Sequence, residues 1–399
     1  MIDRDTLLRE AREDLLRSRF AQAKQRYREV LEADKLDVDA LAGMTRVSLA
    51  EGKFREARDH ADRVLAEQPE HVEAKILRLV AIEAEGDPRT ALAEMRKVAD
   101  RHPSSCLASY HVGRLLAAAG NGEQSLPWLE RAFEQADRAR HRYAIMNLIG
   151  YVQQDLGRLG DAVRSHQRAV DISAKRTEAY VALAEALTRG DDVDASLTIL
   201  DEAERKIGEH SDLQRKRAEL LAGRGDLTGA RQAAQRVCDR HPDDGSAWLM
   251  LSRLAMASGD FLAAEQAATR SRNAEPGAWQ PHFQLGLAFD ARDDSEQAEA
   301  AYREALALAP SSWHPANNLG LVLLARGTEA AASEAAELFA QATKMAGPGE
   351  LGPRFNSALA LARLADKTAE CRKLCQQLLA RELPEPQRAK LEALLAELG

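Results

Sequence analysis

Few residues in this chain have the types and spacing that chemistry requires. Cys371 and Cys375 are four residues apart, so on a helix they would share a face and could supply two ligands to a metal ion. Neither a histidine nor a pair of carboxylates nearby completes a set of four ligands. Packing as small apolar side chains is the favoured interpretation, and we expect no metal site.

Motifs for catalysis or cofactor binding are missing or misplaced. Gly223, Gly225 and Gly229 approach a dinucleotide-binding fingerprint, but they follow a predicted helix where that fingerprint follows a strand. The two segments Asp100–Pro103 and Asp239–Pro242 share the sequence Asp-Arg-His-Pro, and their histidines suit the end of a helix. No phosphate-binding loop, zinc-protease motif or nucleophile elbow occurs in the sequence. The sequence therefore predicts no enzymatic activity and no cofactor.

The composition narrows the class of protein further. The 399 residues are 45% hydrophobic but only 5% aromatic, and the net charge is −8. This acidic balance argues against nucleic-acid binding, and no apolar run is long enough to insert into a membrane. Residues 1–10 lack the features of a secretory signal, which favours a cytoplasmic location. Arginine is commoner than lysine, which favours a bacterial source.

The elements that position any site follow from a 34-residue period, which is typical of repeat architectures. Pro242, Pro276 and Pro310 are 34 residues apart, and so are Pro69 and Pro103. Three series of residues agree in phase once a three-residue insertion near residues 138–142 is allowed. Their members are prolines, the glycines Gly52, Gly86, Gly120, Gly157, Gly190, Gly225, Gly259 and Gly327, and the alanines Ala23, Ala57, Ala91, Ala162, Ala230, Ala264 and Ala298. Each unit is predicted to be a helix, a turn closed by a left-handed glycine, and a second helix that ends before proline.

This pattern resembles the tetratricopeptide repeat family. The best matches to its signature are Trp248, Leu251, Gly259, Phe261, Ala264 and Pro276, followed by Leu285, Gly286, Phe289, Ala298, Tyr302, Ala305 and Pro310. The resemblance implies an all-α fold, a right-handed α-α superhelix or solenoid of ten to eleven helix–turn–helix repeats with a C-terminal capping helix. We expect a repeat array over 4–351, a degenerate eleventh repeat over 352–383 and the capping helix over 384–399. The ten units begin near residues 4, 38, 72, 106, 143, 177, 211, 245, 279 and 313.

Several units depart from the family pattern. The third has Lys75 and Arg78 where the family has apolar residues, and the seventh has Gln214 and Arg217 there. We expect these two units to pack less tightly or to present unusual chemistry. Regularity is expected to fail at 136–143 and 326–334.

The resemblance also implies a concave groove lined by fixed places of each first helix. The ninth place holds Arg12, Arg46, Arg114 and Arg253, none of which has an acidic residue three or four positions away. Unpaired guanidinium groups would suit capture of carboxylates. The alternative is that acidic residues of neighbouring repeats pair with them, notably those that recur at the second place: Asp5, Asp39, Glu73, Glu178 and Asp212.

Other groove places carry polar and aromatic residues. The central stretch contains Tyr110, His111, Asn147 and Tyr151, and a later stretch contains Phe283, Gln284, Asn317 and Asn318. Trp279 and Trp313 stand one period apart at entry turns, where they either staple the helix start or form an outer anchor for another protein.

These observations predict a non-catalytic scaffold or adaptor that binds a protein or peptide partner, in one version an acidic extended segment, in the concave groove. The alternative is a regulatory or assembly subunit that docks a larger enzyme or envelope machine through its outer face or its ends. A third interpretation, an enzyme whose site is built across repeats, leaves no linear motif. The sequence leaves the oligomeric state open.

Overall fold

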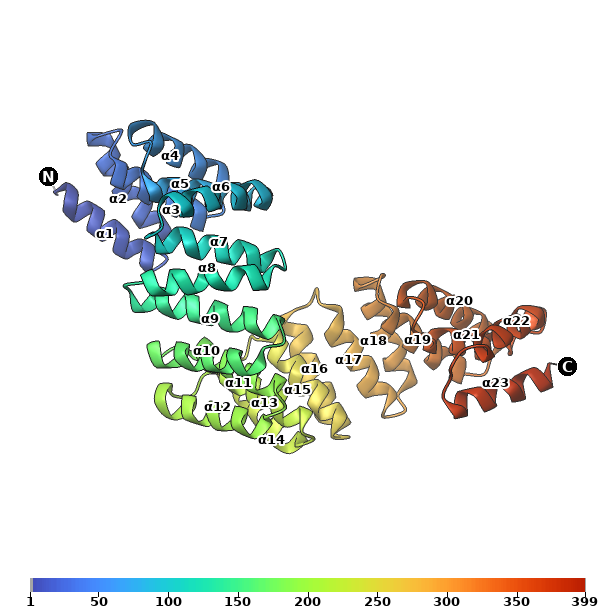
Figure 1. The fold of residues 1–399 in the computed structure, drawn as a ribbon. Helices are drawn as coiled ribbons and strands as arrows, with labels where there is room; N and C mark the ends of the chain where they lie inside the picture. The colour runs from blue at the N-terminus through green and yellow to red at the C-terminus, as the bar shows by residue number, and fades with distance from the viewer. Residues whose placement is uncertain (1–2, 399) are drawn as a thin grey trace. The chain divides into compact units, whose positions relative to one another are not determined.

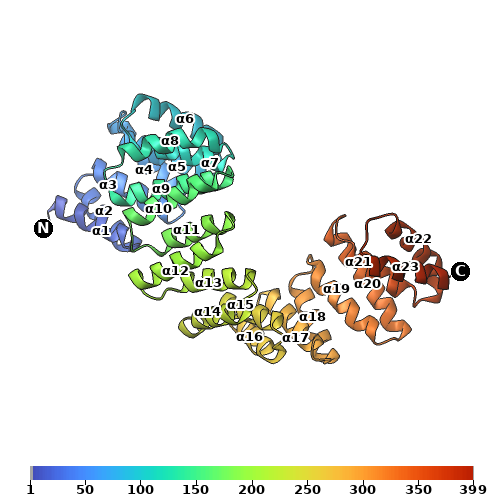
Figure 2. The same ribbon diagram turned by 60° about the horizontal axis from the view of Figure 1, so that its bottom comes forward.

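The computed structural model describes residues 3–398, and within them every regular element is helical. Twenty-three α helices follow one another in pairs, with one short 3₁₀ helix near the C-terminal end. Within each unit described below, consecutive helices pack against each other, as both views show (Figure 1 and Figure 2). The predicted all-α solenoid is therefore confirmed. The chain divides into two compact units, one ending at Gly208 and the other starting at Glu209.

The first unit holds six helix pairs. Its first helices are α1 (Arg4–Leu16), α3 (Val38–Ala50), α5 (Val72–Ala84), α7 (Cys106–Ala118), α9 (Ala139–Asp155) and α11 (Thr177–Arg189). Its second helices are α2 (Phe20–Ala33), α4 (Phe54–Glu67), α6 (Pro88–Arg101), α8 (Gly122–Gln135), α10 (Leu159–Ile172) and α12 (Val193–Ile207). The start of α9 differs from the expected residue 143, because the inserted residues lengthen this helix at its N-terminal end.

The second unit holds four regular pairs and an irregular end. Its first helices are α13 (Ser211–Gly223), α15 (Gly245–Ala257), α17 (Trp279–Asp290) and α19 (Trp313–Ala325). The second helices are α14 (Leu227–Arg240), α16 (Phe261–Ala274), α18 (Ser295–Leu308) and α20 (Glu329–Ala346). Beyond them lie α21 (Gly352–Leu361), η1 (Ala365–Lys367), α22 (Thr368–Leu379) and α23 (Glu385–Glu397). Leu391 of α23 is fully buried in the last apolar cluster, where it packs among residues of α21 and α22.

The three series of residues explain why the chain folds this way. Alanines of the predicted series, such as Ala23, Ala162 and Ala298, are fully buried and let the two helices of a repeat approach closely. In the fourth repeat Ser125 takes this place, and its hydroxyl donates a 2.7 Å hydrogen bond to the Gly113 carbonyl. Prolines such as Pro276 come two residues after a second helix ends. Aspartates such as Asp37 and Asp260 begin helices by accepting a hydrogen bond from a backbone N–H.

The turn inside each repeat requires a left-handed residue, and glycine supplies it in most of them. Gly52 and Gly259, for example, have φ of 72° and 74°. The prediction is wrong for Gly190, where the left-handed residue is the following Asp191, with φ of 62°. Asp191 stands at the same place relative to the start of α11 as Gly52 does relative to the start of α3, so the turn is regular and Gly190 lies one residue before it. Ser18 and Asp293 adopt the same conformation in the first and ninth repeats.

Polar residues in the departing units are held by local ion pairs. The Lys75 ammonium lies 2.8 Å from Glu70, and Arg78 lies 2.5 Å from Asp62. These side chains therefore present charge on the surface of the third repeat, where the family pattern expects apolar packing.

Candidate functional site

The first five repeats form a groove of about 980 Å³. Successive first helices α1, α3, α5, α7 and α9 all contribute to it, as expected for the concave side of such an array. Its apolar lining includes Leu15, Leu16, Ile76, Leu77 and Ile145. Leu16 is 68% exposed, which leaves its apolar side chain available to a partner.

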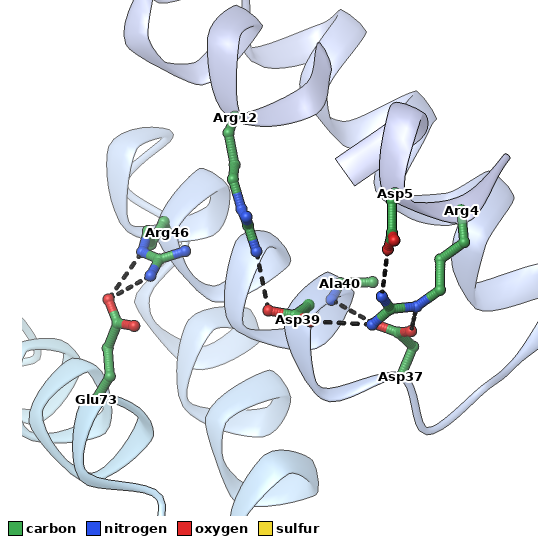
Figure 3. Close-up of polar contacts among 8 residues, drawn as sticks. All are labelled: Arg4, Asp5, Arg12, Asp37, Asp39, Ala40, Arg46 and Glu73. Carbon is green, nitrogen blue, oxygen red and sulfur yellow. Dashed lines mark hydrogen bonds and ion pairs between the residues drawn. The ribbon is translucent and has the colours of Figure 1, made fainter. Parts of the chain in front are cut away.

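Two of the arginines expected in this groove line it, but each has an acidic partner. Arg12 donates a 2.9 Å hydrogen bond to Asp39, and Arg46 donates a 3.1 Å bond from Nε to Glu73 (Figure 3). Both acids belong to the next repeat along the chain. The expectation of unpaired guanidinium groups is therefore wrong here, and the alternative of pairing between neighbouring repeats is confirmed for these two.

Arg4 extends this network at the start of the chain. Its guanidinium group binds Asp5, Asp37 and Asp39 at 2.8, 2.5 and 2.9 Å (Figure 3). Asp37 also accepts a hydrogen bond from the backbone N–H of Ala40 and so caps α3. Asp39 and Glu73, at the second place of their repeats, thus link neighbouring repeats through ion pairs. Their distance along the sequence from their arginine partners hides this role in a search within one helix.

The other two predicted arginines lie outside the lining of this groove. Arg114 forms a bidentate ion pair with Glu83 of the preceding repeat, with one nitrogen–oxygen distance of 2.9 Å. Arg253 is exposed in the second unit, and it makes no ion pair with any residue that the structure describes. Only Arg253 of the four therefore fits the expectation of a free guanidinium group.

Sequence reasoning missed two arginines that line the groove without an ion pair to any described residue. Arg138 and Arg140 stand at the start of α9, next to His141 and Asp137. Arg140 donates to the His141 ring at 3.3 Å, and burial together with the positive charge of both arginines lowers the pKa of His141. The signal was available as the Arg-x-Arg-His-Arg run inside the insertion at residues 138–142. This end of the groove is electropositive.

The central polar residues fall into two environments. Tyr110 lines the groove and contacts the His111 ring edge-to-face, with 5.4 Å between centroids. Burial lowers the pKa of His111 to about 3, and its Nδ1 has no hydrogen-bond partner among residues 3–398. Asn147 and Tyr151 contact the buried His166 instead of the groove, through a 2.9 Å hydrogen bond and a 5.0 Å ring contact.

The predicted residues of the second unit do come together. Phe283 lies 5.8 Å from Trp279 and 6.2 Å from His314, measured between ring centroids. Trp313 stacks on His314 at 3.9 Å. Both tryptophans are half-buried against neighbouring rings, so their entry turns are packed and still accessible.

A chain of amides adjoins these rings. Asn318 donates to the Tyr302 hydroxyl at 3.4 Å, Asn317 donates to Asn318 at 3.3 Å, and Asn356 donates to Asn317 at 2.9 Å. Gln284 is buried nearby on α17, and within the described part of the chain its Oε1 accepts no hydrogen bond. Asn356 and His314 are not among the residues predicted from the repeat pattern.

Neither a metal-binding cluster nor a membrane-spanning helix occurs among residues 3–398. The described residues contain no cluster of three or more histidine, cysteine or acidic side chains that could hold a metal ion. Cys371 and Cys375 are buried, with their sulfur atoms 4.0 Å apart, and burial raises the pKa of Cys371 to about 12. Between residues 3 and 398 no helix has the length and apolar character needed to cross a membrane.

The fold and the groove define the class of protein, an all-helical array of stacked repeats with a groove along the first helices of its first five repeats. Models of the tetratricopeptide repeat match residues 15–81, 83–140, 211–254 and 283–333, which together are more than half of the chain. The chain belongs to the tetratricopeptide repeat family. Such repeats are scaffolds for protein interaction in general, and none of these models describes an enzyme.

Solved structures of other repeat proteins are similar to this chain. A tetratricopeptide repeat protein of Parabacteroides merdae is 16% identical over 64% of this chain and 98% of its own, with a TM-score of 0.46. The protein TTC0263 of Thermus thermophilus is 19% identical over 47% of this chain and 100% of its own, with a TM-score of 0.42. Yeast Tom70 is 13% identical over 99% of this chain and 88% of its own, with a TM-score of 0.42. Comparison with curated protein sequences gives no significant match.

Proposed function

We propose that this protein is a non-catalytic scaffold that holds an extended, acidic segment of a partner protein in the groove of its first five repeats. The observation that carries the proposal is one groove of about 980 Å³ that combines an apolar lining with two arginines that pair with none of the acids in residues 3–398, at its α9 end, where Asp137 also lines it. Leu15, Leu16 and Leu77 offer apolar contacts, while Arg138 and Arg140 offer guanidinium groups at one end. The free thiols Cys106, Cys238, Cys371 and Cys375 suit action in the reducing cytoplasm.

The ion pairs decide which arginines are available to an acidic partner. Arg12 and Arg46 can bind a carboxylate of the partner only if they release Asp39 or Glu73. Each exchange loses one exposed ion pair, worth up to about 1 kcal/mol, for the new ion pair that it forms. Arg138 and Arg140 can bind a carboxylate with no such exchange, because neither is in an ion pair with a described residue. We therefore expect acidic side chains of the partner at the α9 end of the groove and apolar ones along α1 and α5.

The experiment is affinity capture with the full chain, mapping of the captured partner on a peptide array, and titration of the mapped peptide by fluorescence anisotropy. We expect the double substitution Arg138→Gln and Arg140→Gln to weaken binding by about tenfold or more, the cost of one or two lost charged contacts. Higher salt should weaken the wild-type complex and leave the variant complex almost unchanged.

The matched control is Arg55→Gln with Arg89→Gln. These two exposed arginines lie at the starts of α4 and α6, outside the groove lining, and their replacement removes the same amount of charge. Equal affinity of both double variants for the peptide would contradict the proposal. Circular dichroism should show equal helix content in all three proteins.

A second candidate function is that of a regulatory or assembly subunit that docks a larger machine through its outer face. The half-buried Trp279 and Trp313 and the amide chain Asn318–Asn317–Asn356 favour the second unit as the surface for this role. If Trp313→Ala removes the captured partner while Arg138→Gln with Arg140→Gln does not, this candidate replaces the first.

A further inference from the structure

The second unit has a separate hollow of about 460 Å³ on the side of its second helices. Its walls are the exposed sides of α14 and α16, and its floor is the back of α15, with Trp248, Leu251 and Ala255. No residue of the first-unit groove takes part in it. Its volume falls within the range of about 300–1,000 Å³ that is common for ligand-binding pockets.

The hollow exists because three residues that face it end at Cβ. Ala255 of α15 and Ala263 and Ala267 of α16 leave the space between α14 and α16 unfilled. Below them the Trp248 indole is fixed, since its Nε1 donates a 2.8 Å hydrogen bond to the Pro242 carbonyl. The floor is therefore rigid and apolar, which lowers the entropic cost of binding a side chain there.

The rim of the hollow is positive. Its lining contains Arg231 and Arg270 but no carboxylate, in a chain whose net charge is −8. Arg231 is engaged, since it binds Asp260 at 2.8 Å and the Ser258 hydroxyl at 3.2 Å. Arg270 lies 4.5 Å above the Trp248 ring, and none of the acidic side chains in the described part of the chain pairs with it. A stacked guanidinium group keeps its N–H donors directed outward for a carboxylate.

Amides complete the rim. Gln232 and Gln266 are exposed on either side of the hollow, where they can bond the backbone of a segment that crosses it. Tryptophan and arginine together are the residues that most often carry the affinity of a protein interface. The charge of the rim selects an acidic partner over a basic one.

We propose that this hollow is a second docking site, which takes an acidic segment of a partner protein. One apolar side chain of that segment enters against Leu251 and Ala267, and a neighbouring carboxylate binds Arg270. The site acts independently of the groove in the first unit.

The test is selection from a phage-displayed library of random peptides on the wild-type full chain, with each selected peptide then titrated by fluorescence anisotropy. Ala263→Leu is the blocking variant, because a leucine at this partly exposed helical position fills the hollow and keeps helix propensity. Arg270→Gln removes the free charge. We expect a class of peptides rich in aspartate or glutamate beside an apolar residue, whose affinity falls by about tenfold or more with either substitution.

Arg89→Gln is the matched control, since Arg89 is exposed and lines neither the hollow nor the groove. We expect it to leave the affinity of this class of peptides unchanged, and circular dichroism should show that all three variants fold. The proposal is overturned if no selected peptide depends on both Ala263 and Arg270, or if those that do have no excess of acidic residues. Peptides lost only with Arg138→Gln and Arg140→Gln report on the groove and leave this site without support.

Discussion

His166 in the fifth repeat is fully buried and is held as a neutral ring. It takes the place in the fifth repeat that Tyr27 and Tyr302 take in the first and ninth, where a large side chain fills the core. Nδ1 lies 2.9 Å from the Asn147 amide oxygen, and Nε2 lies 3.2 Å from the Gln154 nitrogen. A ring with its proton on Nδ1 satisfies both contacts, and burial lowers the pKa of His166 to about 4.

The low pKa makes stability depend on pH. Between about pH 6.5 and 4 the unfolded chain binds a proton at this histidine and the folded chain does not, so acidification favours unfolding. We expect His166→Tyr to fold and to lose less stability than wild type on acidification, by up to about 1.4 kcal/mol per pH unit. Urea unfolding at pH 7, 6 and 5 measures this difference. Other histidines, His111 included, are present in both proteins and cancel in the comparison.

An equal loss of stability in the two proteins would mean that His166 becomes protonated without unfolding. A further control, Asn147→Asp, places a negative charge beside Nδ1 and should raise the pKa of His166. The pH range over which acidification destabilises the Asn147→Asp protein through His166 should then be narrower than in wild type, because its lower end rises with the folded pKa while its upper end stays near the unfolded pKa of 6.5.

The sequence correctly predicted that the groove arginines lie on first helices, but the expectation that they are unpaired was wrong. The periodic places predicted that Arg12 and Arg46 lie on the groove, because a helix fixes the direction of each side chain. Their acidic partners, Asp39 and Glu73, lie 27 residues further along the chain and become neighbours only when repeats stack. Arg138 and Arg140 were missed because the insertion breaks the lattice from which places were counted.

At the scale of the element, the turn between the two helices of a repeat is built on one left-handed residue. Gly52 fills this role at φ of 72°, and a Cβ added to it would meet no atom within 4 Å. Ser18 adopts φ of 57° in the same turn of the first repeat and carries the strain of an L residue there. The two turns are therefore a matched pair within one unit.

We expect Ser18→Gly to stabilise the protein and Gly52→Ala to destabilise it, each by about 1 kcal/mol or less. The cost at Gly52 is due to backbone conformation alone, since space for the methyl group is open. Urea denaturation followed by circular dichroism gives both values. If Ser18→Gly lowers the free energy of unfolding, as Gly52→Ala is expected to do, the serine side chain stabilises its turn and the expectation of strain at Ser18 is wrong.

The elements themselves were largely predictable, because turn glycines, closing prolines and small buried alanines are required by backbone geometry wherever they recur. Helices α3, α5 and α7 begin at Val38, Val72 and Cys106, where the lattice placed the starts of repeats. The lattice failed at α9, whose start at Ala139 depends on how the inserted residues continue a helix. The glycine series failed at Gly190, because the left-handed residue at the regular place of this turn is Asp191.

At the scale of the molecule, each unit has its own set of apolar clusters. Leu7, Tyr27 and Val47 belong to one cluster of the first unit, and Ile76, Met95 and Leu116 belong to another. Each helix packs mainly against the helices next to it in sequence, so stability is close to a sum of local terms. The lining of the groove falls between Arg12 and Ile145.

A chain that ends at Gly208 should therefore fold and keep the binding activity proposed for the groove. We expect it to bind the mapped partner peptide within about twofold of the affinity of the full chain, because each lining residue and the repeat beyond α9 are retained. A shorter chain that ends at Gln135 loses α9 with Arg138 and Arg140, and it should bind the peptide at least about tenfold more weakly. Fluorescence anisotropy with both fragments makes the comparison, and circular dichroism establishes that each is helical. If the longer fragment is helical but does not bind, the peptide requires the second unit, and the groove of the first unit is at most part of its site.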